Sequence, residues 1–158
     1  MKFIIILLAI ITAIYLYVQL LVSRLDFNFG LSKIDLSKFQ LGRVITGGSS
    51  NAKVVVDASI TNANSVNLSF SNLYIEIYYN ETLIAYSTDN ISNYAKVVIE
   101  AGSVTIIQEE LNIVVNGNTV DFGLKMNLNE QLLISYKIRL KLLGLITFGY
   151  TGTKTLNS

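Results

Sequence analysis

Apolar and polar residues alternate most regularly in Ile134-Ser-Tyr-Lys-Ile-Arg-Leu-Lys-Leu142, and this stretch sets the expected fold class of the 158-residue chain. Its apolar side chains take the even-numbered positions, and its polar or charged side chains take the odd-numbered ones. Successive side chains of a β-strand point to opposite faces of a sheet, so the alternation predicts a strand with one buried and one wet face. Such half-polar strands are typical of antiparallel sheets.

The same period of two recurs outward from this stretch. Lys53–Thr61 is a predicted strand, with its valines, Ala58 and Ile60 alternating with polar residues. A second strand is expected from Val66 to Tyr79, and its alternation changes parity at Ser71-Asn72, which predicts a β-bulge. The other expected strands cover residues 31–45, 83–88, 96–101, 104–115, 119–128 and 145–155.

Polar and glycine-containing segments separate these strands. Asn80-Glu81 and Asn116-Gly-Asn118 are predicted turns, and Gly47–Asn51 and Asp89–Asn93 are predicted loops. About seven or eight strands with turns about every 8–12 residues predict an all-β fold. We expect residues 31–158 to form an antiparallel β-sandwich of the Greek-key, immunoglobulin or fibronectin type, without helices.

Residues 3–22 contain no charged side chain. As a helix rising about 1.5 Å per residue, they would be about as long as the hydrocarbon core of a bilayer is thick. We therefore predict a single-pass transmembrane anchor within residues 1–24 and a stalk over 25–30, with the lipid bilayer as a partner. Representative residues of the anchor are Phe3, Leu8, Ile11, Tyr15, Tyr17 and Val22.

A cleaved signal peptide is the main alternative interpretation of this segment, and a buried helix of a soluble protein is the other. Signal peptides have an apolar region of about 7–15 residues followed by a small-x-small cleavage site. The run here is longer, and the residues after Gln19 offer no such site. Lys2 precedes the run, which favours an extracytoplasmic domain (periplasmic or extracellular) under the positive-inside rule.

The composition lacks residues on which common kinds of catalytic and metal-binding sites depend. The chain has no His and no Cys, so the commonest general base, the commonest metal ligand and the thiol nucleophile are missing. Glu109 and Glu110 are adjacent, so a strand would point them to opposite faces. We expect no enzyme activity, no catalytic residues, no metal and no cofactor. The formal net charge of +1 lacks the basic footprint of a nucleic-acid partner.

Three cations form a candidate contact surface, because Lys137, Arg139 and Lys141 share one face of the regular strand. Such a basic stripe could contact anionic lipid headgroups or an acidic partner. The alternative is that these are ordinary solubilising charges, paired with Glu76 or Glu109 across the sheet. We favour this alternative, because three charges are too few to produce a strong electrostatic field.

Three tyrosines form a second candidate contact surface, because Tyr74 and Tyr78 alternate with inward residues and Tyr86 can lie on the same face. Exposed tyrosines make good contacts with little loss of conformational entropy. Equally, they could cover the sheet as cross-strand pairs. A protein partner or self-association is the expected use of such a surface.

Several segments together carry a family resemblance. Val54-Val-Val-Asp-Ala-Ser-Ile-Thr-Asn-Ala-Asn-Ser-Val-Asn-Leu68 and Leu73-Tyr-Ile-Glu-Ile-Tyr-Tyr-Asn-Glu-Thr-Leu-Ile-Ala85 resemble the opening strand and hairpin of the late-embryogenesis-abundant (LEA) type 2 domain, also called the water-stress and hypersensitive-response (WHy) domain. Ile99-Glu-Ala-Gly-Ser-Val-Thr-Ile-Ile107 and the strand from Ile134 are similar to later segments of that family. The resemblance covers about residues 31–156.

The family's hallmark is Asn-Pro-Asn, and this chain has Asn62-Ala63-Asn64 instead. A turn forms without that proline, although it is less pre-organised. The resemblance implies a Greek-key β-sandwich, often behind a membrane anchor, without a known active site. It also implies an association with desiccation and stress.

These features favour a membrane-anchored, non-enzymatic protein that binds or protects a surface. One alternative is a structural component of an envelope complex or of a membrane-containing virus particle. Another is a carrier of lipid or of a small apolar ligand, which requires a cavity inside the domain.

Overall fold

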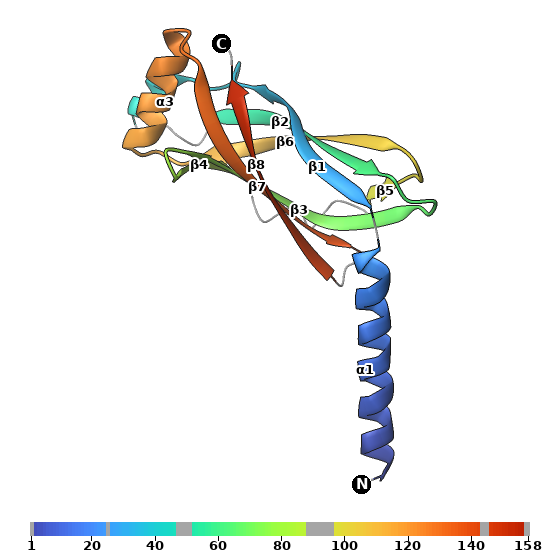
Figure 1. Ribbon diagram of the computed structural model, residues 1–158. Helices are drawn as coiled ribbons and strands as arrows, with labels where there is room; N and C mark the ends of the chain where they lie inside the picture. The colour runs from blue at the N-terminus through green and yellow to red at the C-terminus, as the bar shows by residue number, and fades with distance from the viewer. Residues whose placement is uncertain (1, 25, 47–51, 88–96, 143–145, 157–158) are drawn as a thin grey trace.

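The computed structural model describes residues 2–24, 26–46, 52–87, 97–142 and 146–156, so the predicted loops at 47–51 and 89–93 lie outside the described residues (Figure 1). The described helices are α1 (Lys2–Ser23), α2 (Leu41–Ile45) and α3 (Gly117–Asn127). The described strands are β1 (Phe27–Asp35), β2 (Lys53–Asn62), β3 (Leu68–Tyr79), β4 (Thr82–Tyr86), β5 (Val97–Ile99), β6 (Val104–Ile113), β7 (Leu132–Leu142) and β8 (Ile146–Leu156).

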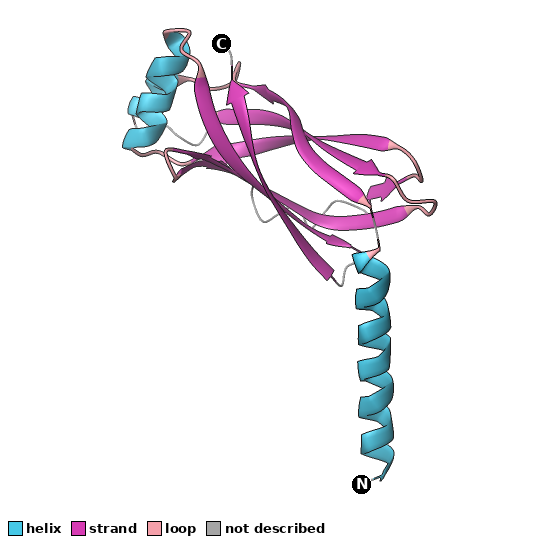
Figure 2. Ribbon diagram, in the orientation of Figure 1, coloured by secondary structure: helices cyan, strands magenta, loops and turns pink. Residues whose placement is uncertain are grey.

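The strands form one antiparallel sheet in the order β1-β2-β6-β4-β3-β7-β8, with β5 beside β3 (Figure 2). The predicted antiparallel all-β class is confirmed. A sandwich of the immunoglobulin type has two separate sheets, whereas here a short β4–β6 pairing makes the sheet continuous. The sheet curls until its edges meet, and the Lys154 ammonium donates to the carbonyl oxygens of Leu31 and Ser32 at 2.7 and 2.8 Å.

The core lies inside this curl and is built from the alternate residues of each strand. On β7, Ile134, Ile138 and Leu140 are each 1% exposed, while Lys137 and Arg139 are exposed. The alternation predicted for this stretch is therefore confirmed. The even-numbered positions of β2 from Val54 to Ile60 are buried in the same core.

Two predicted irregularities of the sheet are confirmed. The β3–β7 pairing shifts register between Ser71 and Tyr74, and Asn72 has a φ of 53°. This is a bulge, which restores the buried face after the change of parity. Asn80 and Glu81 have φ values of 46° and 60°, so two left-handed residues connect β3 to β4, as in a type I′ hairpin.

Helix α1 projects away from the sheet (Figure 1). The described apolar side chains between Ile4 and Leu20 are exposed, and the side chains of Phe3 and Val22 lie outside the description. Across the described ranges, no helix has both the length and the hydropathy needed to cross a membrane. Strand β1 begins at Phe27, within the segment predicted as a stalk. Its residues pair with β2 in antiparallel order, from Phe27 opposite Asn62 to Asp35 opposite Val55.

Two strand predictions are wrong. The first expected strand, 31–45, ends at Asp35, and its last five residues form the short helix α2. The expected strand over 119–128 is the helix α3, whose N-cap is Asn116; the side chain of Asn116 accepts a hydrogen bond from the Thr119 backbone N–H at 2.9 Å. The predicted turn at this asparagine is thus the start of a helix, since a capping side chain satisfies an otherwise unpaired N–H.

Helix α3 packs closely on the segment that precedes α2. The Phe122 ring lies edge-on to the rings of Phe39 and Tyr79, with centroids 5.9 and 5.5 Å away. A Cβ on Gly123 would lie 2.5 Å from Phe39 Cε1 and 2.8 Å from Leu41 Cδ1. Glycine at this position therefore allows the close approach.

Replacing Gly123 with alanine is expected to lower the free energy of unfolding by about 1–3 kcal/mol, the usual cost of overpacking. Chemical denaturation followed by circular dichroism measures the change. Gly117→Ala is the matched control, because a Cβ there meets nothing within 4 Å and should leave stability nearly unchanged. Equal stability of the two variants would contradict the close packing of α3.

Candidate functional site

The predicted contact residues meet on the outer face of β3, β4 and β7, which we call the β3–β7 face. Its residues are Tyr74, Glu76, Tyr78, Tyr86, Lys137, Arg139 and Lys141. Antiparallel pairing sets Tyr74 opposite Arg139 and Glu76 opposite Lys137. On the other side of β3, Glu76 lies opposite Tyr86 of β4. The three tyrosines thus surround one carboxylate.

Aromatic rings and cations alternate across the β3–β7 pairing. The Arg139 guanidinium carbon lies 4.5 Å from the ring centroid of Tyr74, and the Lys137 ammonium lies 4.8 Å from that of Tyr78. A cation over the face of a ring is attracted to its negative quadrupole. The tyrosines are half-buried, so the cations also cover their rings.

Glu76 connects these two cation–ring pairs. Its Oε1 accepts a hydrogen bond from Arg139 Nη2 at 3.1 Å, and its Oε2 accepts one from the Tyr78 hydroxyl at 3.0 Å. The Glu76 side chain is 14% exposed, whereas that of Arg139 is 52% exposed. The predicted pairing of a cation with Glu76 is therefore present. The other predicted partner, Glu109, is buried on the inner face of β6.

The cations of this face outnumber its acids. Lys137, Arg139 and Lys141 stand against the single carboxylate of Glu76. Within the described ranges, Lys141 forms no ion pair and no hydrogen bond. The β3–β7 face therefore keeps a local positive excess, although the whole chain is close to neutral.

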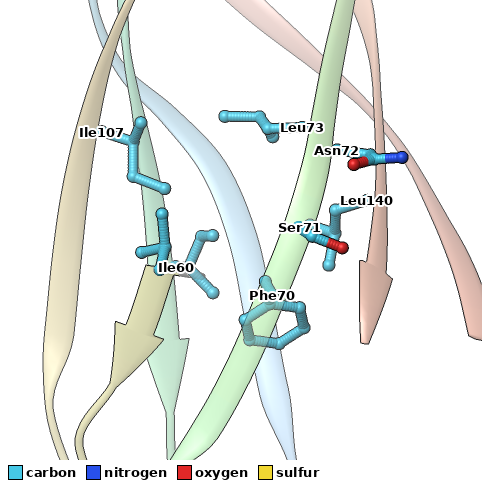
Figure 3. A pocket seen from close by; sticks show the side chains of 8 residues that line it. Ile60, Phe70, Ser71, Asn72, Leu73, Ile107 and Leu140 are labelled. Atoms are coloured by element: carbon cyan, nitrogen blue, oxygen red, sulfur yellow. The ribbon is translucent and has the colours of Figure 1, made fainter. Parts of the chain in front are cut away.

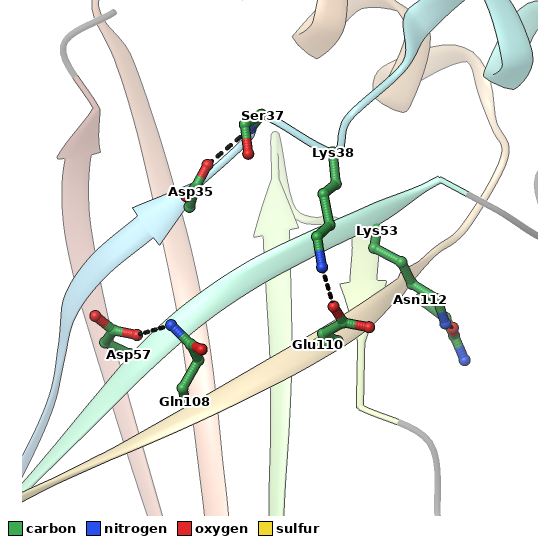
Figure 4. A network of polar contacts seen from close by, with 8 residues as sticks. All are labelled: Asp35, Ser37, Lys38, Lys53, Asp57, Gln108, Glu110 and Asn112. Atoms are coloured by element: carbon green, nitrogen blue, oxygen red, sulfur yellow. Dashed lines mark hydrogen bonds and ion pairs between the residues drawn. The ribbon is translucent and has the colours of Figure 1, made fainter.

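The outer face of β2 and β6 differs, because its charged side chains have ion-pair or hydrogen-bond partners (Figure 4). Lys38 forms an ion pair with Glu110, and Gln108 Nε2 donates to Asp57 Oδ1 at 3.1 Å. The hydrogen bond from Lys38 lowers the pKa of Glu110. The backbone N–H of Ser37 likewise lowers the pKa of Asp35. These carboxylates stay ionised and satisfied, so this face has little charge left to attract a ligand.

A groove lies at one end of the β3–β7 face. It is lined by Asn72, Tyr74, Arg139, Leu140, Lys141 and Thr147. The bulge makes room for it, because Asn72 leaves the regular pairing and Lys141 lies between Ser71 of β3 and Thr147 of β8. The sequence indicated the bulge and the cations separately, but their convergence with Thr147 depends on the pairing of three strands.

The interior offers little space by comparison. Apolar side chains around the bulge, among them Phe70, Leu73, Ile107 and Leu140, enclose a gap in the core (Figure 3). The gap has room for about one water molecule. Ligand pockets are usually larger than about 300 Å³. No described cavity therefore favours the carrier alternative.

The described residues contain no group of three acidic side chains that could bind one metal ion together. Glu109 and Glu110 point to opposite faces of β6, one buried and one exposed. Their separation matches the sequence prediction and rules out a shared proton between them.

Comparisons with known proteins found only solved structures of similar fold. No family model and no curated protein matches the chain. Similar solved structures include a protein from Archaeoglobus fulgidus, with a TM-score of 0.42 and 13% identity over 85% of this chain and 97% of that one. A protein from Arabidopsis thaliana has a TM-score of 0.44 and 12% identity, over 83% of this chain and 78% of that one.

A proposed LEA protein is also among the similar structures, with a TM-score of 0.42 and 11% identity over 93% of this chain and 79% of that one. It is the kind of protein that the sequence resemblance names. At these TM-scores none of the similar structures supports an inference about what this chain does.

Proposed function

We propose that this chain is a non-enzymatic protein that α1 attaches to a lipid bilayer, with the β3–β7 face available to a partner. The observation that carries the proposal is the apolar surface of α1, because a helix that is apolar on all sides requires an apolar environment. Its exposed side chains include Ile4, Leu8, Ile11, Tyr15 and Leu20.

Further apolar side chains support the proposal, because they are exposed at the end of the sheet that α1 joins. Val104 and Ile106 of β6 are 61% and 60% exposed. They lie near the start of β1, since the Asn62 backbone N–H donates to the Ser103 carbonyl and Asn62 pairs with Phe27. An interfacial position would bury them against headgroups and acyl chains.

Charged substitutions in α1 test the attachment. Ile10→Asp and Ile14→Asp together should release the full chain from phosphatidylcholine vesicles, because they replace apolar side chains that α1 would bury among acyl chains with charged ones. Vesicle flotation measures the bound fraction. The control Ile10→Leu with Ile14→Leu should float like the unchanged chain. An unchanged chain that stays in the aqueous fraction would contradict the proposal.

An assembly role is the second candidate, favoured by the same exposed residues of β6. An apolar patch also fits a neighbouring subunit in an envelope complex or virus particle. Sedimentation of the detergent-solubilised chain distinguishes the two, since an assembly role requires a defined oligomer. Stress protection, which the LEA resemblance implies, would be a further use of a surface held at a membrane.

A further inference from the structure

The groove at the end of the β3–β7 face gathers donors for an anion. Lys141 is half-buried there, and no carboxylate lines the groove. Within the described residues the Asn72 side-chain amide, like the Lys141 ammonium, makes no hydrogen bond. The Thr147 hydroxyl lies across from Lys141 on β8. Ammonium, amide and hydroxyl groups are all donors that a phosphate oxygen accepts from.

Arg139 also lines the groove, and its contacts hold its side chain in place. Its guanidinium is held over the Tyr74 ring and bonded through Nη2 to Glu76. A guanidinium carries five N–H donors in a rigid fork, so the bond to Glu76 leaves others to bind a phosphate. The stacking keeps Arg139 in place before any ligand arrives, which lowers the entropy lost on binding.

The groove lies at the end of the sheet from which α1 leaves. The Phe29 ring, near the start of β1, packs edge-on to Phe70 with centroids 6.1 Å apart. Phe70 lies opposite Leu142, the residue after Lys141. In Figure 1 the end of β7 lies toward the α1 side of the domain. With α1 in a bilayer, Lys141 and Arg139 would therefore lie near the headgroups.

We infer that this groove binds the phosphate of an anionic lipid headgroup, at the surface of the membrane that holds α1. The inference rests on the proposed membrane attachment and adds to it a site with a stated ligand chemistry. Free inorganic phosphate offers the same oxygen atoms, but the position of the groove beside α1 favours the lipid. Within the described residues Lys141 has no ion-pair partner, which distinguishes this groove from the face of β2 and β6, where Lys38 is paired with Glu110.

Chemical acetylation of lysines tests the inference on the full chain in a neutral detergent. Dihexanoyl phosphatidylglycerol should slow acetylation of Lys141 several-fold, because a bound phosphate occludes the ammonium, while dihexanoyl phosphatidylcholine should not. Lys33, an exposed lysine of β1, is the internal control. Lys141→Gln should weaken binding of the anionic lipid roughly tenfold, as loss of a charge-assisted hydrogen bond predicts. Lys33→Gln should not weaken it.

Two results would overturn the inference. Equal acetylation of Lys141 with and without the anionic lipid would show that the groove does not bind the lipid phosphate. Protection by inorganic phosphate at the same concentration as phosphatidylglycerol would assign the groove to a free anion. Either result, with the full chain still floating on vesicles, leaves membrane attachment intact. Conversely, a chain that does not float but protects Lys141 would overturn the attachment alone.

Discussion

Replacing Asn62 with alanine is expected to lower the free energy of unfolding by about 3 kcal/mol, because it leaves the buried carbonyl group of Ile99 and two part-buried carbonyl groups without this donor. The Asn62 side chain is fully buried at the end of β2. Its Nδ2 lies 2.9, 3.0 and 3.1 Å from the carbonyl oxygens of Val66, Ile99 and Glu100. One amide thus connects the β2–β3 turn to the connection between β5 and β6.

The second asparagine of the hallmark extends this network. Asn64 donates from its backbone and its side chain to Asn62 Oδ1, and its own Oδ1 accepts from the Asp26 backbone N–H at 2.9 Å. Asp26 immediately precedes β1. The two asparagines therefore join three connections at the end of the domain where α1 ends and β1 starts. At the position where the family that the sequence resembles has proline, the Ala63 backbone N–H donates to the Asp26 carbonyl oxygen at 2.9 Å, a hydrogen bond that proline cannot make.

Urea denaturation measures the predicted loss for Asn62→Ala. Asn67→Ala is the control, because Asn67 accepts a single exposed hydrogen bond, from the Ala101 backbone N–H. An exposed contact of this kind should contribute about 1 kcal/mol or less. If both variants lost the same stability, the buried network would not be what joins these turns.

Sequence alternation predicted the sheet well where one face is buried and the other is wet. The strand from Ile134, the bulge at Ser71-Asn72 and the hairpin at Asn80-Glu81 all follow from local patterns, and the structure has each of them. Sequence could not predict the curl of the sheet into one continuous layer. That arrangement depends on the distant β4–β6 pairing, which local periodicity does not encode.

The helix α3 was missed because its sequence carries two periods at once. Val120, Phe122, Leu124 and Met126 alternate with polar or small residues, as in a strand. The residues that α3 buries are Thr119, Phe122 and Gly123, which have the i, i+3, i+4 spacing of a helix. Leu124 remains 48% exposed. Tertiary packing on Phe39 and the Asn116 cap therefore override the alternation.

The contact residues were predicted individually, and their arrangement was not. Alternation is enough to set Lys137, Arg139 and Lys141 on one face. Their different environments come from the register with β3, which gives Arg139 a ring and a carboxylate and leaves Lys141 beside a bulge. Register is a property of paired strands, so a single sequence did not reveal the groove.

Replacing Gly152 with alanine is expected to lower the free energy of unfolding by about 1–3 kcal/mol, because the added methyl group overpacks the core. A Cβ at Gly152 would lie 2.5 Å from both Cζ and the hydroxyl oxygen of Tyr136. Tyr136 is 6% exposed and lies directly opposite Gly152 in the β7–β8 pairing. An aromatic ring covering a glycine on the neighbouring strand fills the space that a side chain would take.

The surroundings of the Tyr136 ring leave it little freedom to move away. Burial raises the pKa of its phenol. The ring of Tyr150 lies next to it, with centroids 6.2 Å apart, and Lys154 of the same strand bonds across to β1. A displaced Tyr136 would therefore disturb the contact between the two edge strands. We expect the cost of Gly152→Ala to include part of that contact.

Thermal and urea unfolding should distinguish Gly152→Ala from its matched control, Gly149→Ala. Gly149 lies on the outer face of β8, where a Cβ meets only Arg139 Cγ, at 4.0 Å. A surface change of this kind should alter stability by about 0.5 kcal/mol or less. Adding Tyr136→Leu to Gly152→Ala should recover part of the loss, since residues in contact are energetically coupled. Without such recovery, the steric explanation of Gly152 would be wrong.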